Sequence, residues 1–174
     1  MKATGVVRRI DDLGRIVIPK EIRRNLRIRD GESLEIFVDG NNIILKKFSI
    51  MSNVDEYAIN MADAIHALTK KSVVITDNDS VIACSSNLKD IFNKSISDSL
   101  GVSIKRRESI LEKYDKSLSL TMDYSVSCKY AMNAIIANGD SVGLVIIFDK
   151  DEIGDDDMLI ASLASKILSK SIEE

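Results

Sequence analysis

Two short stretches near the start of the chain have strand-like patterns. In residues 6–10, Val6, Arg8 and Ile10 alternate with Val7 and Arg9, which gives a strand with two unlike faces, and in residues 15–18 every apolar residue is β-branched. Alternation with a period of two is typical of β-strands, and the β-branched residues in both stretches favour the same structure. The intervening residues 11–14 form a turn sequence, in which Gly14 can adopt a positive φ. Pro19 follows the second stretch and suits the first turn of a helix.

A short helix and a hairpin are predicted next. Ile22 and Leu26 are four residues apart, so they lie on one face of the helix and can contact a core. Alternating residues 34–38 and a returning strand at 43–47, which begins with three apolar residues, flank a turn at 39–42, which indicates a β-hairpin. Residues 1–50 are therefore predicted to form four short strands and one short helix.

Helices are predicted at both ends of the remaining chain. Over residues 54–70, apolar residues recur three and four apart, at Val54, Ala58, Met61, Ile65 and Leu68. The last segment opens with three aspartates at 155–157, which favour a helix N-terminus. Its apolar stripe consists of Ile160, Leu163, Ala164, Ile167 and Leu168.

The segment between these helices predicts an antiparallel sheet. Its expected strands are residues 72–76, 81–84, 117–122, 130–137 and 142–148, and residues 87–113 are expected to form short helices and loops. The order helix, sheet, helix is an α+β layer arrangement, in which both terminal helices would cover one face of the sheet. The stretch 49–53 is the expected boundary between a domain at 1–50 and a domain at 54–174.

Charge is distributed unevenly between these two domains. Residues 1–50 contain 11 Lys and Arg against 7 Asp and Glu, a net charge of +4, whereas the rest contains 13 against 20, a net charge of −7. Arginine outnumbers lysine seven to four in the first domain but falls to two against eleven in the second. Because guanidinium groups match phosphates and guanine edges, this bias favours binding of a nucleic acid such as double-stranded DNA, with a solvated charged face as the alternative.

Four segments carry a family resemblance: Lys2-Ala3-Thr4-Gly5, Arg8-Arg9-Ile10-Asp11, Leu13-Gly14-Arg15 and Ile18-Pro19-Lys20-Glu21-Ile22-Arg23-Arg24. They resemble the N-terminal domain of the AbrB family of bacterial transition-state regulators. The resemblance implies a swapped-hairpin β-barrel that two chains form together. It also implies the DNA-binding residues, which are expected to be Arg8, Arg9, Arg15, Lys20, Arg23 and Arg24.

The second domain resembles a GAF domain in the order of its elements. GAF domains are small-molecule sensors and dimerisation modules, so a pocket for a small-molecule effector and a ligand-free dimerisation core both stay open, and no pocket residue is assigned. The resemblance over the whole chain implies a transcription regulator that controls gene expression during sporulation. Two apolar helix stripes on one sheet face predict that the second domains associate, which would give a homotetramer.

Catalysis and metal binding have little support in the sequence. His66 is the single histidine, and no catalytic motif accompanies it. Acidic clusters at 77–79 and 155–157 are too short for an EF-hand. Cys84 and Cys128 lack the spacing of a metal site or a disulfide, although a redox pair would be an enzymatic alternative. We therefore expect a protein without enzymatic activity, cofactor or metal.

An antitoxin is the alternative function, because antitoxins share this N-terminal fold. Antitoxins of that type usually neutralise the toxin with a short, flexible tail, whereas about 120 ordered-looking residues follow the first domain here. No apolar run approaches the roughly 20 residues of a membrane span, and the N-terminus has no signal-peptide pattern. The sequence thus predicts a cytoplasmic, nucleoid-associated protein.

Overall fold

The computed structural model describes residues 5–173 except residues 27, 29, 32 and 48–54. The chain divides into two compact units, residues 1–48 and residues 49–174, which we call unit 1 and unit 2. The stretch 49–53, expected to be the domain boundary, lies outside the described residues.

Unit 1 consists of a helix, a hairpin and an extended segment. Helix α1 spans Lys20–Asn25, with Pro19 at its N-cap position. Strands β1 (Leu34–Asp39) and β2 (Asn42–Lys47) pair antiparallel in continuous register, which confirms the predicted hairpin. Gly40 has a φ of +57° in the connecting turn, a conformation that glycine adopts without steric cost.

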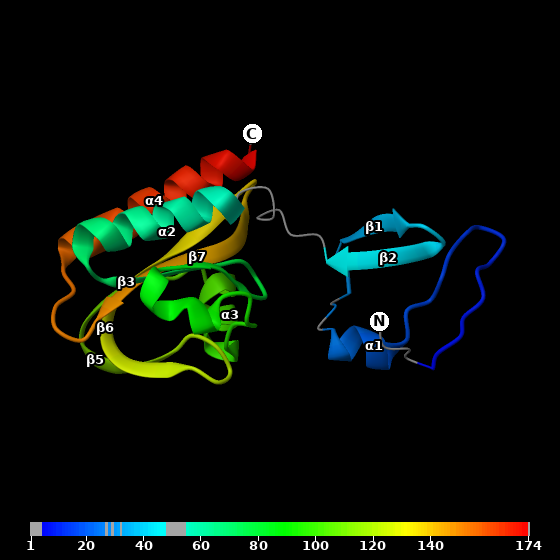
Figure 1. The fold of residues 1–174 in the computed structure, drawn as a ribbon, viewed down its shortest axis with the longest axis horizontal. Helices are drawn as coiled ribbons and strands as arrows, with labels where there is room; N and C mark the ends of the chain where they lie inside the picture. Colours follow the sequence, from blue (N-terminus) through cyan, green and yellow to red (C-terminus); the bar gives the residue numbers. More distant parts are fainter. Residues whose placement is uncertain (1–4, 27, 29, 32, 48–54, 174) are drawn as a thin grey trace. The chain divides into compact units, whose positions relative to one another are not determined.

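The predicted strands at 6–10 and 15–18 are not strands in this chain. Residues 5–19 instead run out as an extended segment, turn at 11–15, and return to α1 (Figure 1). We call residues 5–19 the arm. A strand exists only where a neighbouring strand completes a ladder of hydrogen bonds. In the arm, backbone bonds from Asp11 N to Arg15 O and from Gly14 N to Asp11 O close the turn, and no ladder is assigned to residues 6–10 or 15–18.

Unit 2 contains a five-stranded antiparallel sheet in the order β4-β3-β7-β6-β5. Its strands are β3 (Ser72–Thr76), β4 (Val81–Cys84), β5 (Ser109–Ser119), β6 (Ser125–Ala137) and β7 (Asp140–Asp149). The hairpins β3–β4 and β6–β7 are confirmed. Strand β7 lies at the centre, which explains its almost continuous apolar sequence, because both faces of the sheet are covered.

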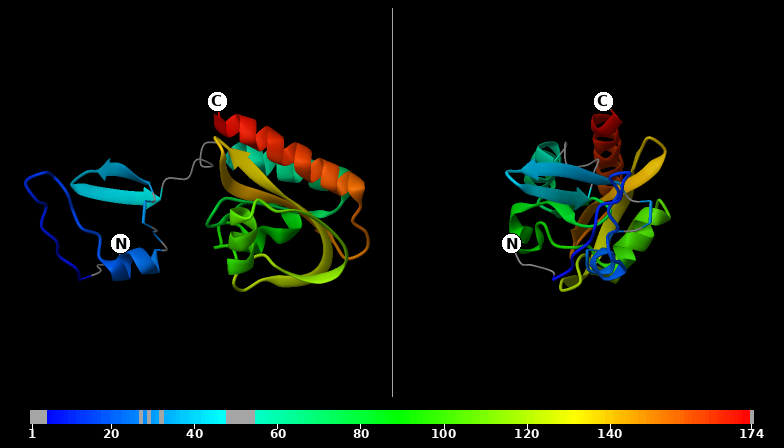
Figure 2. Two further views of the ribbon diagram at one scale, coloured as in Figure 1. Left: turned by 180° about the vertical axis from the view of Figure 1, so that it is seen from behind. Right: turned by 90° about the vertical axis from the view of Figure 1, so that its right-hand side faces the viewer.

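Helices cover the two faces of this sheet (Figures 1 and 2). Helices α2 (Asp55–Thr69) and α4 (Asp155–Glu173) pack on one face, as predicted, around a core that includes Val73, Ile75 and Ile147. The 3₁₀ helix η2 (Ser86–Ile91) and helix α3 (Asp98–Lys105) cover the other face. The unit is thus the α+β layer structure that the sequence predicted.

Strand β5 begins earlier than the sequence indicated. Residues 109–113 were expected to lie in helices or loops, and the strand was expected to span 117–122, but β5 runs from Ser109 to Ser119. The register against β6 shifts between Glu112 and Lys116, where the strand carries charged, exposed residues. An edge strand with a bulge and a polar outer side lacks the alternation that identifies strands.

The buried faces of the two long helices also differ from the prediction. Helix α2 buries Ala58 and Ile65, whereas Leu68 is 80% exposed. Helix α4 buries Ala164 and Leu168 but exposes Leu163, at 58%. Alanines allow a helix to approach the sheet closely, so the small residues face the core and several larger ones face outward. Ile167 of the predicted α4 stripe is also exposed, at 46%.

Candidate nucleic-acid interface

The turn of the arm is built around the carboxylate of Asp11. Its Oδ1 accepts hydrogen bonds from the backbone N–H groups of Leu13, at 3.1 Å, and Arg15, at 2.7 Å. Its Oδ2 accepts from Arg15 Nε at 2.7 Å, which forms an ion pair across the turn. Gly14 N donates to the Asp11 carbonyl at 3.0 Å, with a φ of +76° at the glycine. One aspartate therefore fixes the turn and one arginine side chain on it.

These bonds change the electrostatics of the turn. The pKa of the Asp11 carboxyl lies below its ordinary value, first because the backbone N–H of Arg15 donates to it and then because the Arg15 side chain does. The carboxylate is thus ionised beside a guanidinium that remains 72% exposed. The tip of the arm presents a cation whose direction is set by the protein.

The predicted DNA-binding residues lie on the arm and on α1. Arg8 and Arg9 are exposed on the outgoing half of the arm, and Arg8 donates to the Val7 carbonyl at 3.1 Å. Lys20 and Arg24 are exposed on α1. Arg23, also on α1, is half-buried and forms an ion pair with Asp30. The structure thus brings all six basic residues into one small unit and pairs Arg15 and Arg23 with carboxylates.

An apolar hollow of about 250 Å³ lies beside these residues in unit 1. The arm contributes Val6 and Ile16, α1 contributes Ile22, the C-cap residue of α1 is Leu26, and Arg8 also lines the hollow. None of the residues of unit 1 whose exposure is described is buried. Unit 1 of a single chain therefore has basic groups and open apolar surface on the same elements.

Sequence reasoning identified the arginines but missed their carboxylate partners. Residues 11–14 were predicted only as a turn, whereas Asp11 also binds the Arg15 side chain. The available signal was the spacing Asp-x-x-x-Arg around a glycine, in which an aspartate side chain can bond to backbone groups two and four residues on. The pair formed by Arg23 and Asp30 has no such local signal, because a loop separates the two residues.

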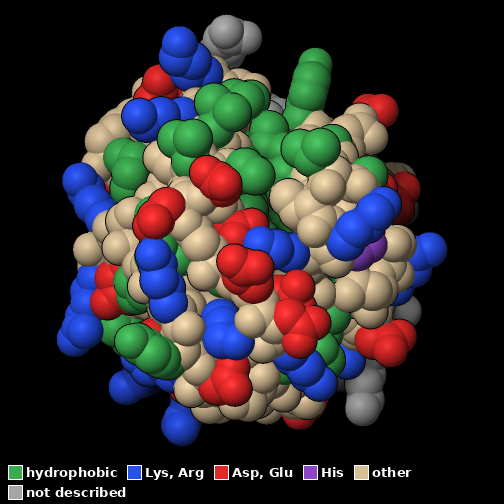
Figure 3. Space-filling view, turned by 90° about the vertical axis from the view of Figure 1, so that its left-hand side faces the viewer, with side chains coloured by type: hydrophobic (Ala, Val, Ile, Leu, Met, Phe, Trp, Pro, Cys, Tyr) green, Lys and Arg blue, Asp and Glu red, His purple; other side chains and the backbone are tan. Residues whose placement is uncertain are grey.

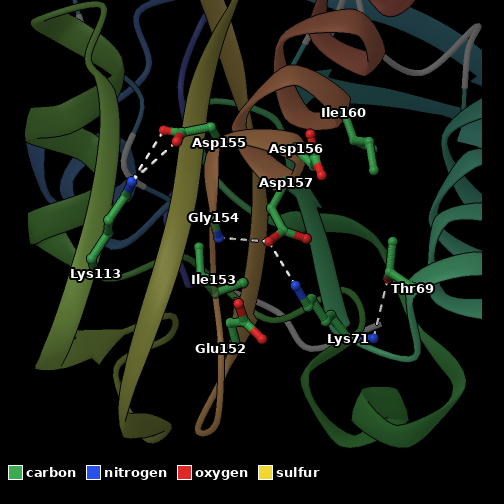
Figure 4. A pocket seen from close by; sticks show the side chains of 10 residues that line it. All are labelled: Thr69, Lys71, Lys113, Glu152, Ile153, Gly154, Asp155, Asp156, Asp157 and Ile160. Atoms are coloured by element: carbon green, nitrogen blue, oxygen red, sulfur yellow. Dashed lines mark hydrogen bonds and ion pairs between the residues drawn. The ribbon is translucent and has the colours of Figure 1, made fainter.

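A second polar site lies in unit 2, in a hollow of about 680 Å³ at the start of α4 (Figures 3 and 4). The Lys71 ammonium contacts Asp157 Oδ2 at 2.6 Å, and the Asp157 side chain is only 5% exposed. Gly154 N donates to the same oxygen at 2.8 Å. Lys113 reaches Asp155 from β5, at 3.2 Å. These bonds join the α2–β3 connection, β5 and the start of α4.

The residues considered for enzymatic chemistry are engaged or buried. His66 Nδ1 lies 2.7 Å from the Lys71 carbonyl, a bond that ties the end of α2 to the next connection. Burial raises the pKa of the Cys128 thiol to about 11, with smaller contributions from Asp115 and Asp149. Burial likewise raises the pKa of Cys84. Both thiols are therefore weak nucleophiles at neutral pH.

Two further observations concern metals and membranes. Within the described part of the chain, no group of three or more His, Cys, Asp or Glu side chains is arranged to hold a metal ion. In the same residues, no helix combines the length and the apolar character that crossing a bilayer requires.

Comparison with known proteins defines the class of this protein. Residues 7–49 match the family model for the bacterial antitoxin MazE, described as antidote-toxin recognition. The chain is 58% identical to the transition state regulatory protein AbrB of Bacillus subtilis over 48 residues, which are 28% of this chain and 50% of AbrB. The GAF domain of an Acinetobacter phosphoenolpyruvate-protein phosphotransferase shares the fold of unit 2, with a TM-score of 0.57 at 12% identity over 73% of this chain and 84% of that chain. The protein is a DNA-binding transcription regulator with an AbrB-like N-terminal unit and a GAF-like C-terminal unit.

The family follows from the full-length comparison. Residues 53–173 match the model described as stage V sporulation protein T C-terminal, transcription factor. The chain is 47% identical to stage V sporulation protein T of Bacillus subtilis over 179 aligned positions, which cover 100% of both proteins. The chain belongs to the stage V sporulation protein T family, in which the regulator acts in the context of sporulation.

Proposed function

We propose that this regulator binds specific operator sequences as a homodimer of unit 1, through Arg8, Arg9, Arg15, Lys20, Arg23 and Arg24. The observation that carries the proposal is the fixed turn of the arm, where Asp11 holds the guanidinium of Arg15 at an exposed tip. The other five basic residues extend from the arm and from α1. Such an arrangement suits both phosphate contacts and contacts to base edges. Operators on the chromosome would place this activity on the nucleoid, in the cytoplasm.

A second copy is proposed because one chain leaves unit 1 unfinished. Val7 on the outgoing half of the arm is 85% exposed, and Val17 on the returning half is 72% exposed. On β1, Val38 is 77% exposed. Each such side chain would gain about 1.5–3 kcal/mol on full burial. A second chain that pairs with the arm would supply this burial and the missing ladder bonds, as in the swapped-hairpin barrel implied by the resemblance to AbrB.

The dimer is tested with a charge at a residue that is exposed in one chain. Val17→Glu should give a monomer in sedimentation and abolish DNA binding, because the barrel interface cannot bury an unpaired carboxylate. Asn41→Glu, in the β1–β2 turn, adds the same charge and should leave both properties unchanged. If Val17→Glu sediments as the wild type does and binds DNA normally, this dimer is wrong.

DNA recognition is tested by the salt dependence of binding. Two chains that each present Arg8, Arg15, Arg23 and Arg24 offer eight arginines to one site. If half to two-thirds of them contact phosphate, the logarithm of the binding constant should fall with the logarithm of salt concentration with a slope of about −4 to −5. Loss of one phosphate contact should make the slope shallower by about one. A slope near zero on every duplex would rule out binding through these residues.

An antitoxin function is the second candidate, and the match of residues 7–49 to the MazE model favours it. The large folded unit 2 argues against it, since antitoxins of this type usually neutralise the toxin with a short, flexible tail. Affinity purification of the native protein from its own cells separates the two functions. A stoichiometric small partner whose toxicity the protein relieves would support the antitoxin, and recovery of the homo-oligomer alone would support the regulator.

Unit 2 is proposed to join two DNA-binding dimers into a tetramer. Leu159, Leu163 and Ile167 form an exposed stripe on α4, each four residues from the next, at 69%, 58% and 46% exposure. Hydrophobic side chains gather over the helices at the top of Figure 3. Pairing of two such stripes would bury them. When one assembly carries two DNA-binding dimers of unit 1, binding of the second dimer to the same DNA becomes intramolecular. This raises the avidity by about 10²–10⁴.

Variants of the full-length protein test the tetramer. Leu163→Glu should convert tetramers to dimers, keep the affinity for DNA with one operator, and lose the added affinity for DNA with two operators. Lys166→Glu adds a carboxylate to an exposed position of the same helix and should remain tetrameric. Equal two-operator affinity for Leu163→Glu and the wild type would contradict the avidity argument.

A small-molecule effector of unit 2 is the remaining part of the proposal. The hollow beside Lys71 and Asp157 has a volume in the range of ligand sites, about 300–1,000 Å³. Thermal unfolding with libraries of amino acids and nucleotides tests for an effector, because a ligand that binds only the folded unit raises its midpoint. If no compound in these libraries raises the midpoint, unit 2 is better explained as a dimerisation core.

A further inference from the structure

We propose that Asp11 is a specificity-determining residue, which holds Arg15 for a base edge and weakens its attraction to phosphates. The inference rests on the proposed function, because it concerns how one arginine of that interface is used. It starts from the ion pair at the turn, in which Asp11 Oδ2 accepts from Arg15 Nε at 2.7 Å.

The geometry leaves the outer end of the guanidinium available. Within the described part of the chain, only Nε of the Arg15 guanidinium is hydrogen-bonded, and the side chain is 72% exposed. A guanidinium has five N–H donors, so four donors on the two η nitrogens remain. Two parallel donors on that edge match O6 and N7 of guanine in the major groove. Asp11 thus occupies Nε and leaves the η donors for a ligand.

The charge of Asp11 acts on the same arginine in a second way. An ionised carboxylate 2.7 Å from the cation offsets much of its charge at longer range. This carboxylate is ionised at neutral pH, because the pKa of Asp11 is lowered from an ordinary value that is already well below neutrality. Its negative charge also repels a phosphate brought to the turn, and such a repulsive element discriminates against the wrong partner. A base-edge contact retains its directional hydrogen bonds, whereas a phosphate contact loses most of its attraction.

The backbone bonds allow these two roles to be separated from folding of the turn. Asp11 Oδ1 accepts from Leu13 N and Arg15 N, and an asparagine side chain has a carbonyl oxygen that can accept the same two bonds. Asp11→Asn therefore keeps the turn and removes the ion pair. Asp12→Asn is the matched control, because within the described residues the Asp12 side chain forms no hydrogen bond or ion pair and the change in net charge is identical.

The test measures the ratio of two dissociation constants for the full-length protein. One duplex is the sequence that the wild type selects from a random pool, and the other has the same composition in shuffled order. Asp11→Asn should lower the ratio of shuffled to selected dissociation constants by about fivefold or more, the discrimination lost with one bidentate base contact. It should also steepen the salt slope on shuffled DNA by about one per chain, as Arg15 becomes a phosphate contact. Asp12→Asn should change neither discrimination nor slope beyond the effect of net charge that both variants share.

A double-mutant cycle excludes a purely structural role for Asp11. If Asp11 acts through Arg15, Asp11→Asn should have no further effect on the ratio in an Arg15→Ala background. Equal ratios for Asp11→Asn and Asp12→Asn would overturn the inference while wild-type selection still succeeds. Failure of the wild type to select any sequence would overturn the proposed function itself.

Discussion

Replacement of Gly143 by alanine should weaken unit 2, because β7 and β3 approach too closely for a side chain at this position. A Cβ on Gly143 would lie 1.9 Å from the Thr76 carbonyl oxygen, 3.0 Å from the Thr76 carbonyl carbon and 3.3 Å from the Asp77 Cα. All three atoms belong to the backbone, so no rotamer change relieves the overlap. Strand β7 or strand β3 must move.

The size of the effect follows from that displacement. An ordinary contact of a Cβ lies at 3.4–4 Å, so the two strands must separate by about 1.5 Å locally. Overpacking costs about 1–3 kcal/mol, occasionally more, and each weakened ladder hydrogen bond adds about 1 kcal/mol. We expect Gly143→Ala to lower the unfolding free energy of unit 2 by about 3 kcal/mol, which corresponds to a thermal unfolding midpoint roughly 10 °C lower.

The same substitution at Gly101 is the control. Gly101 lies in α3, and a Cβ there would meet no atom within 4 Å. In a helix interior, alanine is favoured over glycine by about 0.5–1 kcal/mol, so Gly101→Ala should stabilise the unit. The assay is urea unfolding at fixed protein concentration, followed by tyrosine fluorescence. All four tyrosines, Tyr57, Tyr114, Tyr124 and Tyr130, belong to unit 2, so the signal reports on this unit. If Gly143→Ala unfolds at the same urea concentration as the wild type, the argument that β3 and β7 leave no room for a side chain at residue 143 is wrong.

Three further outcomes can be measured. Lys71→Met leaves the nearly buried Asp157 carboxylate without its cation and should lower the unfolding free energy by about 3 kcal/mol. Lys113→Met removes an exposed ion pair and should lower it by under about 1 kcal/mol. Urea titration measures both effects. The Cys128 thiol, with a pKa of about 11, should be about 10⁻³ ionised at pH 8 and should react with a thiol reagent only after unfolding; rapid labelling of the native protein would contradict this. The pKa of Asp11 is lowered below its ordinary value of 3.8. The stability that the ionised Asp11 side chain gives to the turn should therefore be fully present above pH 3.8 and should be lost as the pH falls through the lowered pKa. NMR shifts of the Leu13 and Arg15 amides, which bond to Asp11, would follow this loss.

Much of unit 2 could be predicted because its signals are local. Two β-branched runs around a turn predict the hairpin β3–β4, and two long apolar runs around Gly139 predict the hairpin β6–β7. Helix α4 carries its three aspartates in the first turn, as predicted. These features depend on neighbours in sequence, so one chain contains the information that decides them.

The features that could not be predicted depend on distant neighbours. The apolar stripe of α2 was predicted to include Leu68. In the structure, the face of α2 that carries the alanines packs on the sheet, and Leu68 is exposed to solvent. The sequence predicted a shorter β5, because the first half of this strand is largely polar. Pairing with β6 makes that half a strand. At the candidate interface, residue types indicated the arginines, whereas the bond between Asp11 and Arg15 required the turn geometry.

The arm shows most clearly why periodicity and single-chain structure can disagree. Residues 6–10 and 15–18 have strand-like sequences, yet they belong to neither of the two sheets in the described part of the chain, and most of their side chains are exposed. Isolated β-branched residues gain little from an extended conformation in water, because the preference for strands reflects packing against neighbours. A strand pattern without a partner in its own chain is therefore best explained by a partner in another chain. In the proposed dimer, formation of strands at 6–10 and 15–18 and association of two unit 1 copies would therefore be one event, whereas the turn between these stretches would form earlier. The turn held by Asp11 forms from bonds within the chain, so the specificity element would be preformed before the barrel that carries it to DNA is complete.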